Sequence, residues 1–247
     1  MGKSKVLLVV EGEKVEKELF EHFYSLYGMQ DVEIVAYRTN IYAFYNRLRN
    51  DFGDTDGKIV YDYIDLPLFL NDYLGLEGDQ LLNDYDFKDK ILIFDYDPHD
   101  PQYSLEKLEE LLSNFSNSTE LGKLYLNYPM VESYNDLSSF NEDEFINYSI
   151  HIDLVRNRRG KISEYKAYVD SRTCIKNIKD IDNEIANLLF KLHSKKFCSI
   201  VGIDECDGTD GHVLLCKRQS ENLEKNELIW VINTGILHLY DEYGFIK

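Results

Sequence analysis

Two short apolar runs, each closed by acidic residues, decide the fold: Val6-Leu-Leu-Val-Val10 before Glu11-Gly12, and Lys90-Ile-Leu-Ile-Phe94 before Asp95-Tyr-Asp97. A continuous run of β-branched and aliphatic residues is typical of a strand that is buried on both faces of a parallel sheet. The first run is followed by apolar residues at helical spacing between Glu13 and Tyr27, and a glycine ends this pattern. A strand, a tight turn and a helix are the opening of an α/β fold.

The rest of the chain continues this alternation. Strands are predicted at 32–37, 123–126, 213–216 and 228–232, and helices at 41–48, 105–115, 164–177 and 181–195. Residues 51–89, with short acidic helices around 66–82, are interpreted as a helical insertion that packs on the sheet. The sequence therefore predicts an α/β fold with a mostly parallel, Rossmann-like sheet that is flanked by helices.

The charge of the chain limits its interactions with nucleic acids. Its 247 residues include 27 Lys and Arg against 45 Asp and Glu, which gives a net charge of −18. Such a surface repels phosphate backbones, so a generic nucleic-acid coat protein is excluded. Basic residues are concentrated at 156–196, where 11 Lys or Arg stand against 5 Asp or Glu. Any nucleic-acid contact must therefore come from a local patch such as this one, which includes Arg156, Arg158, Arg159 and Lys161, or from a metal.

Composition also indicates the compartment. The four cysteines, at 174, 198, 206 and 216, have no paired spacing, and nothing resembles a signal peptide. The longest apolar run is far too short to span a bilayer. We therefore expect a reduced, cytoplasmic protein that does not enter the membrane.

The acidic residues that close the apolar runs are the candidate functional residues. In open α/β sheets, ligands bind outside the carboxyl ends of the strands, which is where Glu11 and Asp95 are predicted to lie. Residues i and i+2 of a strand point the same way, so Asp95 and Asp97 are expected to aim at one place. If the two strands are neighbours, Glu11 joins them, and three such carboxylates need a cation. Oxygen ligands of this kind select Mg²⁺ or Mn²⁺, although acids at strand ends also cap helices or face solvent.

These residues resemble the motifs of a known family. The run Val9-Val-Glu-Gly-Glu-Lys-Val-Glu16 resembles the first motif of Toprim domains, and Ile93-Phe-Asp-Tyr-Asp97 resembles their Asp-x-Asp motif. The first run is also similar to the Glu-Gly-x-x-Thr-Glu opening of RloB-like proteins, with Val15 in place of Thr. Asn127-Tyr-Pro-Met-Val-Glu132 resembles their Asn-Pro-x-x-Glu element, with Tyr128 inserted. The resemblance implies a Toprim-like core at 1–135. The remaining residues, 136–247, do not match the family and are interpreted as a C-terminal α+β extension.

The resemblance also implies roles for individual residues. Glu11 would be the acid or base beside the metal, Asp95 and Asp97 would be metal ligands, and Glu132 would serve the same metal or a second one. Glu16 is a further candidate ligand, or else an acid in the first turn of a helix that the helix dipole favours. Several carboxylates suit two ions, which phosphodiester hydrolysis uses to activate water and to stabilise the leaving oxygen. From the basic segment, Lys166 is a candidate catalytic residue, or else part of a solvated basic face.

The function implied is a metal-dependent nuclease of the OLD/RloB-like type, acting on DNA or RNA as an effector of antiphage immunity. The chain has no Gly-x-x-x-x-Gly-Lys-Ser/Thr loop, so any ATP-driven sensing must come from a partner ATPase. One alternative is a non-catalytic Toprim-fold subunit of such a complex. Another is an Asp-x-Asp phosphatase or a nucleotidyl- or glycosyl-transfer enzyme, although His99 stands where dehalogenase-type phosphatases have Thr or Val. The sequence leaves open whether the chain forms a homo-oligomer.

Overall fold

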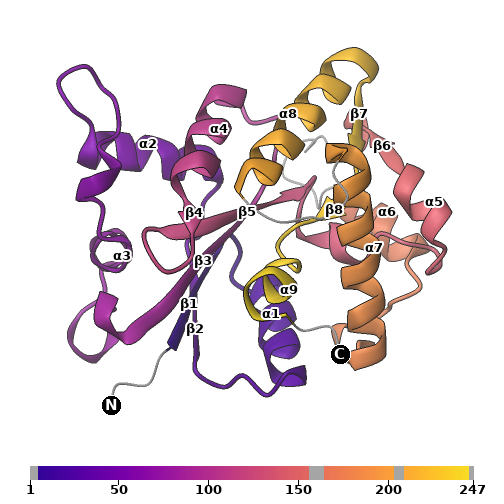
Figure 1. The fold of residues 1–247 in the computed structure, drawn as a ribbon, viewed down its shortest axis with the longest axis horizontal. Coiled ribbons are helices and arrows are strands. Elements are labelled where there is room, and N and C mark those ends of the chain that lie inside the picture. Colours follow the sequence, from indigo (N-terminus) through magenta and orange to yellow (C-terminus); the bar gives the residue numbers. More distant parts are fainter. Residues whose placement is uncertain (1–4, 156–163, 203–208, 245–247) are drawn as a thin grey trace.

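A central sheet of six strands organises the computed structural model, which describes residues 5–155, 164–202 and 209–244 (Figure 1). Its order is β2 (Val32–Ala36), β1 (Lys5–Val10), β3 (Phe87–Asp95), β5 (Gly122–Tyr128) and β4 (Ser116–Asn117), and β8 (Ile232–Asn233) also pairs with β5. Strands β2, β1, β3 and β5 are parallel, whereas β4 and β8 run antiparallel to β5. The prediction of an α/β fold with a mostly parallel sheet is confirmed.

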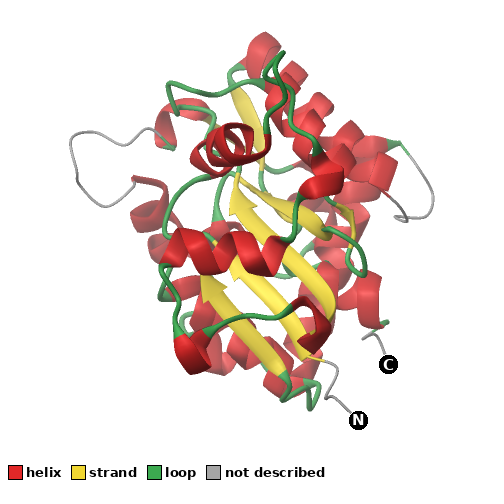
Figure 2. Ribbon diagram, turned by 90° about the vertical axis from the view of Figure 1, so that its left-hand side faces the viewer, coloured by secondary structure: helices red, strands yellow, loops and turns green. Residues whose placement is uncertain are grey.

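Helices cover both faces of this sheet (Figure 2). The α-helices within the described residues are α1 (Val15–Leu26), α2 (Ile41–Phe52), α3 (Leu66–Leu74), α4 (Leu105–Asn114), α5 (Glu142–Asn147), α6 (Glu164–Arg172), α7 (Asn183–Val201), α8 (Thr209–Asn226) and α9 (His238–Tyr243). Leu7 and Val9 of β1 belong to the core cluster that includes residues of α2, α3, α4 and α8. Leu8 and Val10 belong to the cluster that includes residues of α1, α7 and α9. Strand β1 is thus buried on both faces, as its continuous apolar run predicts.

Two of the predicted elements differ in the structure. The run 213–216, expected as a strand, lies inside α8, where Leu215 and Cys216 are fully buried. An apolar run of four residues does not distinguish a buried strand from a buried segment of a helix. In this chain the run belongs to a helix. The run 228–232 is divided between two sheets: β7 (Leu228–Trp230) pairs with β6 (Ser149–His151), and β8 pairs with β5.

The helices of the second half also have shifted ends. Helix α6 ends at Arg172 instead of 177, because the Thr173 hydroxyl accepts a hydrogen bond from the Ile175 N–H at 3.0 Å and so forms a local turn. Helix α7 runs beyond the predicted end at 195 and stops at Gly202, which has a left-handed φ of 79°. The predicted cluster Arg156, Arg158, Arg159 and Lys161 lies outside the described residues.

The last part of the chain packs onto the strands of the first part. Thr234 donates its hydroxyl hydrogen to the Leu126 carbonyl at 2.7 Å, and the Gly235 N–H donates to Asn127 Oδ1 at 3.1 Å. Helix α8 packs against α4. Residues of the predicted extension 136–247 therefore complete the sheet that the predicted core 1–135 begins.

Two observations concern membranes and cysteines. Across the described ranges, no helix is both long enough and apolar enough to cross a membrane. Cys174 and Cys216 are free, whereas Cys198 is disulfide-bonded. The expectation that the cysteines are reduced is therefore wrong at Cys198.

We predict that Gly235→Ala lowers the free energy of unfolding by about 2 kcal/mol, because overpacking a closed core typically costs 1–3 kcal/mol. An added Cβ would lie 2.7 Å from Ile93 Cγ2 and 2.9 Å from Asn127 Oδ1. Urea unfolding followed by circular dichroism measures the change as a lower midpoint. An unchanged midpoint would show that β3 and β5 yield to the methyl group.

Candidate functional site

The candidate site lies where the direction of strand order reverses. From β1 the chain continues to β2 on one side, and β3 occupies the other side, so the carboxyl ends of β1 and β3 flank a topological switch point. The two strands pair in parallel, with Val10 opposite Ile93. Glu11 follows β1 directly, and the Asp95 N–H donates a hydrogen bond to Glu11 Oε2 at 3.2 Å. The sequence-based expectation that these two acids are neighbours is met.

Gly12 allows a third acid to approach. The Gly12 N–H donates to Glu16 Oε1 at 2.9 Å, and Glu16 is only 8% exposed at the start of α1. A Cβ on residue 12 would collide with the Glu16 carboxylate. The Glu-Gly pair after β1 therefore has a steric reason: glycine lets the helix place Glu16 against the turn.

Burial and mutual repulsion act on these acids together. Burial, followed by the charges of Glu11, Glu16 and Glu132, raises the pKa of Asp95 well above its usual range. Burial raises the pKa of Glu11 to about 8; the Asp95 N–H opposes this shift, and the charges of Glu16 and Asp97 add to it. Burial likewise raises the pKa of Glu16, with Glu132 contributing repulsion. A nearby cation would favour the ionised form of carboxylates whose pKa values are raised in this way.

Asp97 is oriented differently from the expectation. Strand β3 ends at Asp95, and Asp97 has a positive φ of 29°, so the strand rule for residues i and i+2 does not extend to it. Burial and the charge of Asp100 raise the pKa of Asp97, while the His99 N–H opposes the shift. Asp97 still contributes to the repulsion felt by Glu11. It therefore lies on the side of the site occupied by Asp100, whereas Glu16 and Glu132 act on Asp95.

Glu132 and Lys166 form the opposite side of the site. Lys166 Nζ lies 3.1 Å from Glu132 Oε1, and the Lys166 side chain is 38% exposed while that of Glu132 is 12% exposed. The charge of Lys166 also opposes the raised pKa of Glu16. Both residues that the sequence singled out here, one after β5 and one in the basic segment, are thus adjacent in space.

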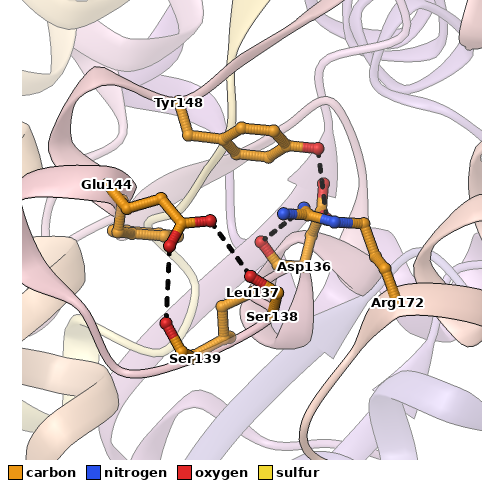
Figure 3. Close-up of a pocket in the computed structure, with 8 residues that line it drawn as sticks. Asp136, Leu137, Ser138, Ser139, Glu144, Tyr148 and Arg172 are labelled. Atoms are coloured by element: carbon orange, nitrogen blue, oxygen red, sulfur yellow. Dashed lines mark hydrogen bonds and ion pairs between the residues drawn. The ribbon is translucent and has the colours of Figure 1, made fainter.

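A buried ion pair holds these two residues together. Lys166 lies on α6, and Glu132 lies on the 3-10 helix η4 (Val131–Asn135). Asp136, fully buried directly after η4, pairs with Arg172 at the end of α6 and accepts hydrogen bonds from Tyr148 and Tyr165 at 3.3 and 2.9 Å. Figure 3 shows Tyr148 and Arg172 converging on Asp136, beside Glu144, whose carboxylate accepts from the Ser138 and Ser139 hydroxyls.

Two residues at the site were missed by the sequence reasoning. Asn127 Nδ2 lies 3.4 Å from Asp95 Oδ1, and its Oδ1 is bonded to the Gly235 N–H. Asp100 adds repulsion at Glu11 and Asp97, and accepts a hydrogen bond from Asn40 Nδ2 at 2.6 Å. Asn127 is the last but one residue of β5 and pairs with Asp95 at the end of β3, so the rule that places sites at strand ends was sufficient to find it.

The donor chemistry of the site fits a hard divalent cation. The grouped carboxylate oxygens, with the amide of Asn127, are the ligand types that Mg²⁺ and Mn²⁺ prefer. Burial and mutual repulsion raise the pKa values of Glu11, Glu16 and Asp95, and a bound cation would favour their ionised forms. Within residues 5–155, 164–202 and 209–244, no three His, Cys, Asp or Glu side chains converge closely enough to hold a metal ion as they stand.

Comparisons of the chain with protein-family models, with curated proteins and with solved structures gave no match. The resemblance to Toprim motifs therefore rests on the residues quoted above.

Without divalent cation, we expect the free energy of unfolding to decrease as the pH rises from about 4.5 to about 8. The folded chain keeps a proton on Glu11, whose pKa is about 8, while the unfolded chain has released it. Each pH unit in that window then costs up to about 1.4 kcal/mol for this group. Thermal unfolding in EDTA should show a weaker pH dependence and a higher Tm at pH 8 for Glu11→Gln than for the wild type. Glu120→Gln, at an exposed position, is the matched control, and equal slopes in all three proteins would contradict the expectation.

We expect Arg172→Met to lower the free energy of unfolding by about 3 kcal/mol, because it leaves the Asp136 carboxylate buried without its cation. Adding Asp136→Asn should restore part of the loss, since the amide carries no charge. Urea unfolding of the two variants measures both effects. If Arg172→Met alone were as stable as the wild type, the hydroxyls of Tyr148 and Tyr165 would be sufficient to stabilise the buried Asp136 carboxylate.

Proposed function

We propose that the chain is a metal-dependent nuclease that hydrolyses phosphodiester bonds in DNA or RNA. The observation that carries the proposal is the contact between the Asp95 N–H and Glu11 at the switch point, with Glu16 and Glu132 close enough to raise the pKa of Asp95. Acids from separate motifs thus meet at the edge of the sheet where ligands of α/β folds bind.

The proposed metal ligands are Asp95, Asp97, Glu16 and Glu132, with Glu11 as a ligand or as the acid or base beside the metal. When bound, one or two Mg²⁺ or Mn²⁺ ions supply an activated water and stabilise the leaving oxygen. Bound cations also reverse the negative potential of the site, which otherwise repels a phosphate.

The other side chains have supporting roles. The Lys166 ammonium group lies 3.1 Å from Glu132 Oε1. From there it can contact a non-bridging phosphate oxygen and stabilise the negative charge that develops on it. Asn127 contacts Asp95 and is itself fixed by the Gly235 N–H, so its amide orients the Asp95 carboxylate. Glu11 holds or releases the proton that water loses during hydrolysis.

The biological setting is proposed from the motif resemblance. By that resemblance the nuclease is an effector of bacterial antiphage immunity in the cytoplasm, and an ATPase or sensor protein controls it. The absence of a phosphate-binding loop in the sequence is the reason to assign ATP-driven sensing to a partner.

We expect Asp95→Asn to reduce metal-dependent cleavage by a factor of about 100 or more, because one carboxylate ligand is lost from the ion-binding group. The assay uses plasmid DNA, single-stranded DNA and RNA with Mg²⁺ or Mn²⁺, and Asp62→Asn, at an exposed position in the insertion, is the matched control. Calorimetric titration of Mn²⁺ into the wild type and into Glu11→Gln/Asp95→Asn should show binding that the double substitution removes. Metal binding that is unchanged by the substitutions, with no cleavage, would instead favour a non-catalytic subunit.

A further inference from the structure

The insertion between α2 and β3 leaves large apolar side chains in solvent. In the described part of the chain five large hydrophobic residues are exposed, and four of them belong to this segment: Tyr63 (75% exposed), Leu68 (64%), Leu81 (45%) and Tyr85 (100%). Single apolar residues that are scattered over a surface need no explanation, whereas exposed apolar residues that gather in one region mark a place where proteins interact.

The exposed residues lie on a segment that is already folded. Leu66 and Leu70 of α3 are buried in the core, whereas Leu68 lies on the other side of the helix and is exposed. The buried Asn71 side chain exchanges two hydrogen bonds of 2.8 Å with the backbone of Leu82. These bonds hold the 3-10 helix η3 (Asp84–Asp86) against α3. The apolar residues on the two elements are thus presented before any partner binds.

A cleft of about 390 Å³ opens within this region. Its apolar lining comes from Tyr61, Ile64, Leu66 and Leu121, and its carboxylates come from Asp62, Asp65, Asp84 and Glu120. Tyr63 stands between two lining residues, and Tyr85 directly follows another. The cleft and the exposed residues of 63–85 form the insertion surface, which combines an apolar hollow with exposed apolar side chains around it.

Negative charge dominates this surface. Among the described residues that line the cleft, Lys90 is the single cation, and its Nζ lies 2.5 Å from Asp84 Oδ1. The cleft therefore has an excess of three carboxylates, and residues 51–89 as a whole contain 11 Asp or Glu and 2 Lys or Arg. Such a charge repels nucleic acids and anionic lipid surfaces, and it complements a protein segment that is rich in Lys or Arg.

The insertion surface lies away from the candidate site. Lys90 is near the start of β3, and Glu120 lies just before β5, so the cleft is at the amino ends of these strands. The acids of the candidate site lie at the carboxyl ends. Five residues of β3 separate Lys90 from Asp95, which corresponds to about 16 Å of extended chain. A protein that binds the insertion surface therefore leaves the carboxyl edge of the sheet open.

We propose that the insertion surface binds a basic segment of a partner protein. An apolar side chain of the partner enters the cleft against Ile64 and Leu121, and flanking Lys or Arg side chains pair with Asp62 and Glu120. Protein interfaces commonly combine a buried apolar anchor with charged pairs at the rim, and complementary charge also speeds the encounter. The inference does not depend on the proposed nuclease function.

The test uses one surface variant and one matched control variant. The surface variant is Asp62→Asn/Tyr63→Ser/Glu120→Gln, which removes two charges and one aromatic ring at exposed positions. The control variant is Asp143→Asn/Glu224→Gln/Tyr240→Ser, which makes the same changes at exposed positions elsewhere. A phage-displayed library of random peptides is selected on the wild type, and the enriched peptides are synthesised with a fluorescent label.

The enriched peptides should carry a net positive charge and at least one large apolar residue. Fluorescence anisotropy should show that they bind the surface variant at least about tenfold more weakly than the wild type, because an anchor and its flanking charges are lost together. Their affinity for the wild type should fall as the salt concentration rises. The control variant should bind them as the wild type does.

Several outcomes would overturn the proposal. These are enrichment of neutral or acidic peptides, enrichment of none, and equal binding of the peptides to the wild type and the surface variant. An equal loss in the control variant would also overturn it, because net charge alone would then explain the effect. If sedimentation shows that the wild type dimerises and the surface variant does not, the occupant is a second copy of the chain and the proposal is wrong.

Two further measurements make these outcomes unambiguous. Thermal unfolding of each variant checks that substitutions at exposed positions leave the fold intact. Cleavage assays on the wild type test the carboxylate site by itself, so the proposed nuclease function and the insertion surface can fail separately.

Discussion

The repulsion between carboxylates that parallel strands hold side by side is the constraint on which the site depends. The parallel pairing of β1 with β3 brings the residues at the ends of the two strands together, and the Asp95 N–H donates to the Glu11 carboxylate. The donors that surround them are single N–H groups and one amide, and neutral hydrogen bonds of this kind contribute only about 0.5–1.5 kcal/mol each. Burial, with the charges of Glu16 and Asp97, accordingly keeps the pKa of Glu11 raised, at about 8, even though the Asp95 N–H opposes the shift. Perturbed pKa values of this kind cluster at functional sites.

The position of the acids follows from the way the sheet is buried. Leu7 and Val9 enter one core cluster and Leu8 and Val10 enter the other, so β1 has no face on which a charge can lie in water. Charged side chains are then tolerated only where the strand ends and the helices diverge. The same burial that stabilises the sheet therefore concentrates polar residues at its carboxyl edge, where Glu11, Asp95 and Asn127 lie at the ends of three neighbouring strands.

The local sequence pattern was sufficient to predict the central strands of the sheet and the part of the site formed by Glu11 and Asp95. The apolar runs predicted β1 and β3, and the strand-end rule brought Glu11 and Asp95 together. It failed at 213–216, because helix α8 is defined by its packing on α4 and α7 and not by its four apolar residues. It failed at Asp97 because a positive φ ends the strand alternation, which no pattern of side chains reveals. The distance between Lys166 and Glu132 depends on the Asp136–Arg172 pair, a tertiary contact between residues 36 positions apart.

The negative charge of the chain is distributed unevenly over the molecule. Residues 51–89 contain 11 Asp or Glu and 2 Lys or Arg, so this segment alone carries half of the net charge of −18. Its helix α3 and the preceding α2 lie at one side of the molecule, and α6, with Lys166, lies at the other (Figure 1). On the proposed function, a polyanion is repelled most strongly by the side that carries residues 51–89, so the field of the protein favours an approach from the side of α6. The excess of acid therefore does not act equally on all faces of the molecule.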